Sequence, residues 1–260
     1  MNWMKKVAVA LVCLLPLGLQ AAKVDTLQVK SPSMNKSIEV VVVSPDVAAM
    51  EACPVIYLLH GYGGNARTWV GIKPDLPKIA DEKGIFFVCP DGKNTWYWDS
   101  PLNADVRYET FISDELVKYV DSHYKTVADR KGRAITGLSM GGHGAMWNGL
   151  RHSDVFSAAG STSGGVDIRP FPKNWEMSVQ IGEKAKYPEN WEKYTVINLV
   201  PTLRKDQIAL IFDCGDSDFF LEVNKNYHEA LLKQGIDHDF ITRPGNHDSQ
   251  YLSLIHISEP

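Results

Sequence analysis

Short apolar or β-branched runs alternate along the chain with segments whose apolar residues recur at helical spacing. The runs cover residues 55–60, 85–89, 133–136, 156–159, 208–212 and 238–242, and glycine, proline or aspartate follows most of them. Such runs are typical of strands buried on both faces of a sheet. Segments 108–124, 143–152 and 222–234 have helical spacing, and Gly235 is placed to cap the last one. The alternation predicts an α/β fold with a mostly parallel central sheet flanked by helices.

Two parts of the chain depart from this alternation. Residues 26–29 and 37–44 are alternating or β-branched with a turn between them, which predicts an antiparallel pair at the start of the sheet. From residue 164 to about residue 200 the periodicity fades. Proline and tryptophan accumulate there, at Pro170, Pro172, Trp175, Pro188 and Trp191. This segment is predicted to be an irregular insertion that lies over the active site at the sheet edge.

Residues 1–22 have the composition of a signal peptide. Lys5 and Lys6 precede an apolar stretch over residues 7–19, and the small residues Ala21 and Ala22 follow it. The stretch is shorter than the about 20 residues that a membrane span needs. We therefore expect a secreted or periplasmic protein without a membrane span, folded as one domain over residues 23–252. A lipid anchor at Cys13 is the alternative, although Ala10, Leu11 and Val12 before it match a lipoprotein motif poorly.

Charge and cysteine usage narrow the range of partners and cofactors. The net charge is −4 and lysine and arginine form no runs, so nucleic acid is not an expected partner. Cys53, Cys89 and Cys214 each adjoin a strand-like run, which favours buried free thiols over the alternative of one disulfide. No cysteine and histidine spacing suggests zinc, and we expect neither a metal nor another cofactor. The sequence does not indicate an oligomeric state.

A nucleophile motif lies between the run at 133–136 and a helical segment. Gly137, Ser139 and Gly141 fit the pattern G-x-S-x-G. A serine on a sharp strand-to-helix turn projects its hydroxyl from the sheet, and the turn needs neighbours without a Cβ. The helix that follows directs its N-terminal amides at the same point, where negative charge would be stabilised. Ser139 is thus the candidate nucleophile.

The base and the acid that a catalytic serine needs follow it in chain order. His247 lies in a loop after the run at 238–242 and is the candidate base. Two aspartates, Asp216 and Asp218, lie in the loop after the run at 208–212. Asp218 is favoured because the apolar residues Phe219 and Phe220 that follow could bury and fix it, and orienting the histidine is the acid's task.

Two backbone amides are candidates for an oxyanion hole. One belongs to Met140, the residue after the nucleophile, and the other to Tyr62 in the glycine-rich loop after the run at 55–60. His60, which begins that loop, is interpreted as a structural hydrogen-bonding residue.

Aromatic residues cluster where a substrate would lie. Trp96, Tyr97 and Trp98 follow the run at 85–89, and Trp175 and Trp191 lie in the insertion. Aromatic faces bind sugar rings or phenolic groups by apolar contact and stacking. Trp96 and Trp98 are the candidate substrate-binding residues, and core packing is the alternative for about half of the cluster.

Five motifs together resemble the esterase D-like family of α/β-hydrolases. They are VIYLLHGYGG, PDGKNTWYWDSP, ITGLSMGGHGAM, DCGDSDFF and PGNHD, and the resemblance covers residues 25–250. It implies the α/β-hydrolase fold, a triad of Ser139, Asp218 and His247, and ester hydrolysis through an acyl-enzyme. One departure is that such enzymes usually have a further helix after the histidine, whereas this chain ends 13 residues after His247. The tail at 253–260 is therefore interpreted as atypical, either truncated or foreign.

The leading functional hypothesis is a serine carboxylesterase that hydrolyses esters on plant cell-wall polysaccharide, with feruloyl (cinnamoyl) esters first. Its substrate would be an ester-bearing carbohydrate or a small phenolic ester. The alternatives are an acetyl-xylan or other carbohydrate acetylesterase, an acyltransferase with the same triad, and a thioesterase similar to S-formylglutathione hydrolase. A carbohydrate-binding module without catalysis is disfavoured by the ordered serine, aspartate and histidine.

Overall fold

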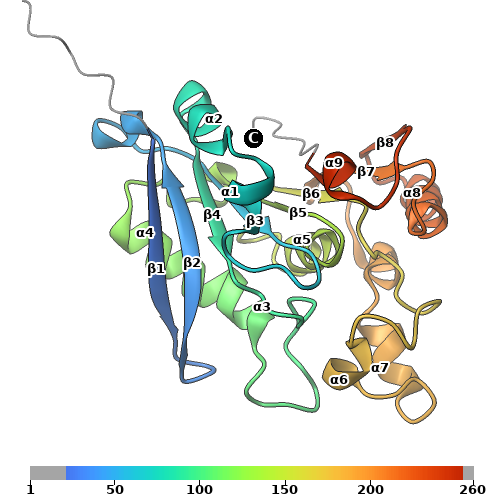
Figure 1. The fold of residues 1–260 in the computed structure, drawn as a ribbon. Helices are drawn as coiled ribbons and strands as arrows, with labels where there is room; N and C mark the ends of the chain where they lie inside the picture. The colour runs from blue at the N-terminus through green and yellow to red at the C-terminus, as the bar shows by residue number, and fades with distance from the viewer. Residues whose placement is uncertain (1–21, 254–260) are drawn as a thin grey trace, which may run out of the picture.

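The computed structural model describes residues 22–253, which form an eight-stranded sheet with helices on both faces (Figure 1). The strands lie in the order β1-β2-β4-β3-β5-β6-β7-β8. β1 pairs antiparallel with β2 and β2 antiparallel with β4, and every later pairing is parallel. The expected mostly parallel α/β sheet and its antiparallel opening pair are confirmed.

The strands follow the apolar runs of the sequence closely. They are β1 (Lys23–Ser31), β2 (Lys36–Ser44), β3 (Val55–Leu59), β4 (Phe86–Pro90), β5 (Arg133–Gly137), β6 (Ala158–Thr162), β7 (Ala209–Gly215) and β8 (Asp239–Arg243). Every residue of β3, β4 and β5 is buried, whereas β8 at the edge has no buried residue. The central strands are apolar throughout because both of their faces are covered.

The helices cover the two faces unequally. They are α1 (Thr68–Ile72), α2 (Leu76–Lys83), α3 (Tyr108–Thr110), α4 (Leu116–His123), α5 (Met140–Arg151), α6 (Met177–Ile181), α7 (Pro188–Lys193), α8 (Leu221–Gln234) and α9 (Ser249–Leu252), with short 3-10 turns at Asp46–Ala49, Arg130–Gly132 and Val196–Thr202. The larger core, on one face, includes side chains of α4, α5 and α8. Trp69 of α1 and Leu76 of α2 belong to the smaller core on the opposite face.

Three elements differ from the sequence prediction. The segment at 108–124 is a helix interrupted by one π turn, Phe111–Glu115. Helix α5 begins directly after Ser139, three residues earlier than predicted, because glycines at its start hide the apolar pattern. The insertion is not wholly irregular, since it contains α6, α7 and a 3-10 turn. The large hydrophobic residues Met177 and Trp191 of these short helices are buried in the main core.

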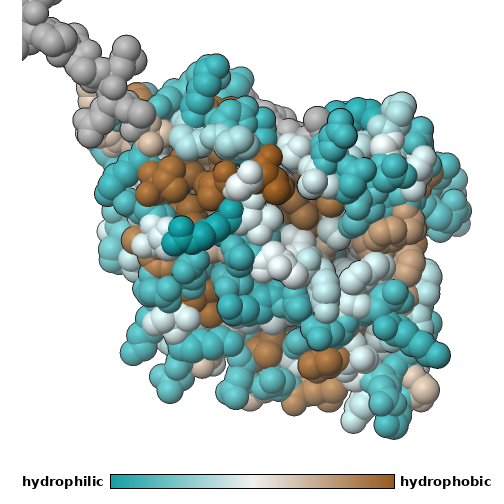
Figure 2. Space-filling model, in the orientation of Figure 1, coloured by the Kyte–Doolittle hydropathy of each residue, from teal (hydrophilic) through white to brown (hydrophobic). Residues whose placement is uncertain are grey.

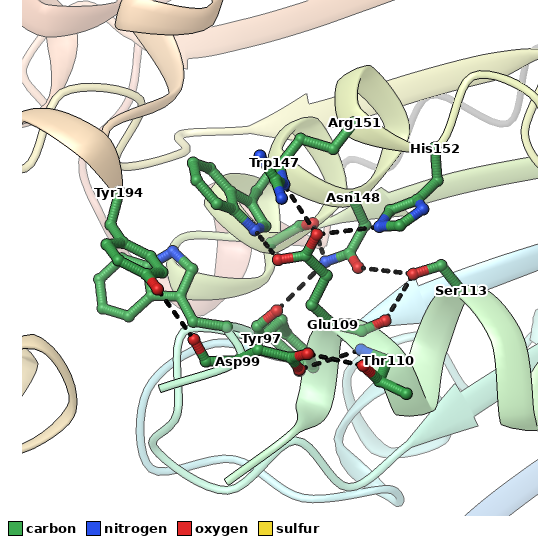
Figure 3. Close-up of polar contacts among 12 residues, drawn as sticks. Tyr97, Asp99, Glu109, Thr110, Ser113, Trp147, Asn148, Arg151, His152 and Tyr194 are labelled. Atoms are coloured by element: carbon green, nitrogen blue, oxygen red, sulfur yellow. Dashed lines mark hydrogen bonds and ion pairs between the residues drawn. The ribbon is translucent and has the colours of Figure 1, made fainter. Parts of the chain in front are cut away.

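A buried carboxylate joins α3 to the C-terminal end of α5 (Figure 3). Glu109, 6% exposed, accepts hydrogen bonds from Trp147 Nε1 at 2.8 Å, Arg151 Nε at 2.7 Å and His152 Nε2 at 2.9 Å. Burial tends to raise the pKa of Glu109, but these three hydrogen bonds outweigh it and the pKa is lowered. The charge is satisfied, so the network fixes α5 without an unpaired buried group.

The predicted state of the thiols is confirmed: Cys53, Cys89 and Cys214 are free and buried. No helix within residues 22–253 is long and apolar enough to cross a membrane. The face of the molecule seen in Figure 2 is mainly hydrophilic, with apolar side chains gathered in a band across its upper part and in smaller areas near its lower edge. The predicted signal peptide, apart from its last residue, and the predicted atypical tail, apart from its first, lie outside the described residues.

Candidate active site

Ser139 occupies a strained turn between β5 and α5. Its backbone has φ 55° and ψ −116°, in a region that residues with a side chain rarely adopt. A Cβ on Gly137 would lie 2.4 Å from the backbone of Gly141, and a Cβ on Gly141 would lie 2.2 Å from the carbonyl oxygen of Leu59. The glycines of the motif are therefore required by the close approach of the turn to β3.

The structure brings Ser139, His247 and Asp218 together in one hydrogen-bonded chain. Ser139 Oγ lies 2.8 Å from His247 Nε2, and His247 Nδ1 lies 2.7 Å from Asp218 Oδ2. A carboxylate only accepts, so Nδ1 carries the proton and Nε2 is left to accept from the serine hydroxyl. The His247 side chain is 15% exposed and that of Asp218 is fully buried. The arrangement can remove a proton from Ser139 and stabilise the imidazolium that results.

The two candidate aspartates occupy different environments. Asp218 Oδ1 accepts the backbone N–H of Phe220 at 2.8 Å, which fixes the carboxylate while Oδ2 contacts the histidine. Asp216 is exposed, and its Oδ1 accepts from Ser217 Oγ at 3.0 Å and from the N–H of Gly245 at 3.3 Å. Asp216 therefore ties two loops together, and of the two aspartates Asp218 is the one that contacts His247.

The Gly61–Tyr62 peptide lies beside the nucleophile. A Cβ on Gly61 would be 3.5 Å from Ser139 Cβ. The Gly61 carbonyl accepts from His60 Nδ1 at 2.7 Å and from the N–H of Gly64 at 3.0 Å. In a trans peptide the carbonyl and the N–H point in opposite directions. Because His60 Nδ1 and the Gly64 N–H hold the Gly61 carbonyl, the Tyr62 N–H points away from these two groups.

The second candidate amide, that of Met140, is at the N-terminus of α5. No hydrogen bond between residues of the described part of the chain uses the N–H of Tyr62 or of Met140. The site thus offers two backbone donors next to Ser139, which is the composition of an oxyanion hole.

Trp96 and Trp98 occupy a different place from the one expected. They are 1% and 0% exposed and stack on each other with ring centroids 5.7 Å apart. Trp96 Nε1 donates to the carbonyl of Trp175 at 3.1 Å, and Trp98 Nε1 donates to His143 Nε2 at 2.8 Å. Both indoles are satisfied core groups, and the assignment as substrate-binding residues is corrected to core packing.

An aromatic surface lies beside the base, formed by Trp175, a member of the aromatic cluster predicted from the sequence, and by Phe219, which was not predicted to contact a substrate. The Phe219 ring is 4.3 Å from the His247 ring, centroid to centroid, and Phe219 is 49% exposed. Trp175 stacks on Phe219 at 5.4 Å with an interplanar angle of 23°. Phe220, the other member of the apolar pair, is buried, so only one of the two faces solvent. The sequence did contain a signal for this exposed ring. Phe219 and Phe220 are adjacent aromatic residues at the start of α8, and two adjacent side chains there cannot both point inward.

A family model described as "Putative esterase" matches residues 31–253. The chain belongs to this family. The resemblance and the fold inferred from the sequence motifs are therefore confirmed, and the protein is a carboxylic ester hydrolase of the α/β-hydrolase type.

Among solved structures, a ferulic acid esterase has a TM-score of 0.75 and 29% sequence identity, and the similarity covers 90% of this chain and 95% of that one. An acetyl esterase of Caldicellulosiruptor saccharolyticus is 26% identical over 76% of this chain and 78% of the relative. The S-formylglutathione hydrolase of Rattus norvegicus is 22% identical over 80% of this chain and 87% of the relative. An esterase of Mycobacterium tuberculosis, 27% identical over 75% of this chain, is longer, and the match spans 48% of it.

Proposed function

We propose that this esterase acts through an acyl-enzyme on Ser139, with His247 as general base and Asp218 as the orienting acid. The observation that carries the proposal is the hydrogen-bonded chain from Ser139 Oγ through both nitrogens of His247 to the buried carboxylate of Asp218. Its supporting feature is the strained backbone of Ser139, which presents the hydroxyl at the end of the sheet.

The reaction follows from these contacts in two halves. Ser139 Oγ attacks the ester carbonyl carbon while His247 Nε2 takes the hydroxyl proton, and the oxyanion forms between the amides of Tyr62 and Met140. His247 then gives the proton to the departing alcohol oxygen, which leaves an acyl group on Ser139. Water, deprotonated by the same nitrogen, attacks the acyl carbon, and collapse of the second intermediate returns the proton to Ser139 and releases the acid.

The test compares hydrolysis of methyl ferulate and p-nitrophenyl acetate by the wild-type protein and by Ser139→Ala. We expect the substitution to abolish turnover of both esters, with a loss of at least about 10³-fold in kcat. A matched control is Ser217→Ala, an exposed serine in the loop of the acid, which should leave turnover unchanged. Full activity of Ser139→Ala would refute the proposed nucleophile.

The substrate class that the site supports best is a feruloyl or similar aromatic ester of plant cell-wall polysaccharide. Phe219 and Trp175 form a stacked apolar surface at the base, suited to a planar phenolic acyl group. The solved structure of a ferulic acid esterase that resembles this chain agrees with that choice. Phe219→Ala should lower kcat/KM for methyl ferulate about fivefold, as expected for loss of an aromatic contact of about 1 kcal/mol, and spare p-nitrophenyl acetate.

The named relatives support the other substrates to be tested. The acetyl esterase relative favours acetylated sugars, which would be the substrate class if the protein hydrolyses the acetate and not the ferulate. Turnover of S-formylglutathione above both oxygen esters would favour the thioesterase, as in the relative of that name. An acyltransferase would form a transesterified sugar when an acceptor is supplied. Export to the periplasm or outside is tested by expressing the full chain in a bacterial host and sequencing the mature N-terminus, which should begin after Ala22.

A further inference from the structure

The turn that presents the Tyr62 amide is held by a side chain from another loop. Gly61 to Gly64 form a reverse turn closed by the bond from the Gly64 N–H to the Gly61 carbonyl, with Gly63 at φ 77°. The N–H of Gly63 belongs to the peptide directly after Tyr62, and it donates to Asn94 Oδ1 at 2.9 Å. Tyr62 therefore has a fixed peptide on each side, one held through the Gly61 carbonyl and one held by Asn94.

An uncharged amide is the side chain that the position of Asn94 requires. Its Oδ1 faces a backbone donor, and its Nδ2 faces the Glu176 carboxylate, to which it donates at 3.2 Å. The Gly63 N–H can only donate and the Glu176 carboxylate can only accept, so these two groups determine the orientation of the Asn94 amide. Aspartate would place two carboxylates together, and alanine would leave the Gly63 N–H without its acceptor.

Glu176 is itself held at the tip of the insertion. Trp175 and Glu176 have φ 47° and φ 53°, and the carbonyl of Trp175 accepts from the indole of Trp96 at 3.1 Å. Desolvation, a hydrogen bond to Glu176 and the charge of that carboxylate raise the pKa of the Tyr62 phenol. Glu176 thus contacts the turn through Asn94, and its charge raises the pKa of the Tyr62 phenol.

The geometry points to Asn94 as a positioning residue for the oxyanion hole, with Glu176 of the insertion fixing Asn94. This inference rests on the proposed function, in which the Tyr62 amide stabilises the oxyanion. It assigns to the insertion a part in the chemical step as well as in substrate binding. Asn94 makes no bond to the reacting atoms, so its removal should weaken stabilisation of the transition state more than binding of the ester.

The test uses Asn94→Ala, Asn94→Asp and the double variant Asn94→Asp/Glu176→Gln. Asn94→Ala should lower kcat for both p-nitrophenyl acetate and methyl ferulate about tenfold while KM changes by less than about twofold. Affinity for a phenylboronic acid, which forms a tetrahedral adduct with a catalytic serine, should fall by a similar factor. Asn174→Ala is the matched control, because Asn174 is exposed in the same insertion and its side chain makes no hydrogen bond within residues 22–253.

The double variant separates positioning from folding. In Asn94→Asp the two carboxylates repel each other, and kcat should fall. With Glu176→Gln added, the new aspartate accepts from both the Gly63 N–H and the glutamine amide, so kcat and boronate affinity should return to within about twofold of wild type. Thermal unfolding of each variant, which should stay near wild type, shows that the losses are not due to misfolding.

Two results would overturn the inference: unchanged kcat and boronate affinity in Asn94→Ala, or a double variant no better than Asn94→Asp. Boronate binding needs no turnover, so the comparison holds whichever ester proves to be the substrate. A wild-type protein that binds the boronate and hydrolyses no ester would refute the proposed function alone.

Discussion

Acid should destabilise this protein through one buried histidine. His143 is in α5, and its backbone N–H bonds to the carbonyl of Ser139 at 3.0 Å. Its ring is fully buried, Nδ1 bonds to the Gly165 carbonyl at 2.9 Å, and Nε2 accepts from Trp98 Nε1 at 2.8 Å. Protonation would turn Nε2 into a donor facing another donor. Burial lowers the pKa of His143 to about 4, although the bond to Gly165 acts in the opposite direction.

The size of the effect follows from the difference between the folded and unfolded pKa values. The unfolded chain binds a proton at His143 below its ordinary pKa of about 6.5, whereas the folded chain binds it only below about pH 4. Between these values protons favour the unfolded state, so stability falls as the pH falls. Relative to pH 8, the loss from this group is about 0.8 kcal/mol at pH 6 and about 2 kcal/mol at pH 5.

Urea unfolding of the wild-type protein and of His143→Gln from pH 8 to pH 5 measures this contribution. Glutamine can donate and accept but does not titrate, so the wild-type protein should lose about 2 kcal/mol more than the variant over this range. His228, whose pKa is also lowered, contributes equally to both proteins and cancels. Equal losses in the two proteins, or a His143 ring that titrates near pH 6.5 by NMR, would refute the reasoning.

Two further substitutions test the acid and the turn. Asp218→Asn should lower kcat by about 10³- to 10⁴-fold with little change in KM, because the amide no longer stabilises the imidazolium, whereas Asp216→Asn should stay within about threefold of wild type in the same steady-state assay. A large loss in Asp216→Asn alone would reverse the assignment. Gly141→Ala should lower the free energy of unfolding by about 3 kcal/mol, since its Cβ would meet the backbone of β3 at 2.2 Å. Gly71→Ala in α1 is the control, because a Cβ there would have no neighbouring atom within 4 Å. Its free energy of unfolding, measured with urea, should stay unchanged or rise by up to about 1 kcal/mol. Equal losses in the two variants would contradict the steric argument.

The parts of the structure that the sequence predicted are those with a local physical signal. Gly137 and Gly141 flank Ser139 because the chain approaches β3 closely there, and that requirement is visible as a motif. Asp218 was preferred because Phe219 and Phe220 could bury it; Asp218 and Phe220 are buried, whereas Phe219 is 49% exposed. The central strands were found because burial on both faces makes them apolar throughout.

The parts that were missed depend on contacts distant in sequence. Trp96 and Tyr97 have φ 57° and φ 60°, and this left-handed backbone turns the Trp96 and Trp98 rings into the core. Residues with large side chains rarely adopt that conformation, so nothing in the local pattern indicates it. The short helices α1 and α2 carry too few apolar residues to show a period, although Trp69 and Leu76 fill the second core.

The bonds between the loop at 91–98 and the insertion also set a rule for redesigning substrate preference. The pairs Trp96–Trp175 and Asn94–Glu176 join residues 79 and 82 positions apart. Grafting residues 164–200 from a relative by themselves could replace Glu176, the acceptor of the Asn94 amide, and could move the backbone carbonyl at position 175 away from the Trp96 indole. A functional chimaera therefore has to carry both stretches from one donor, and the two stretches are expected to change together as one inherited unit.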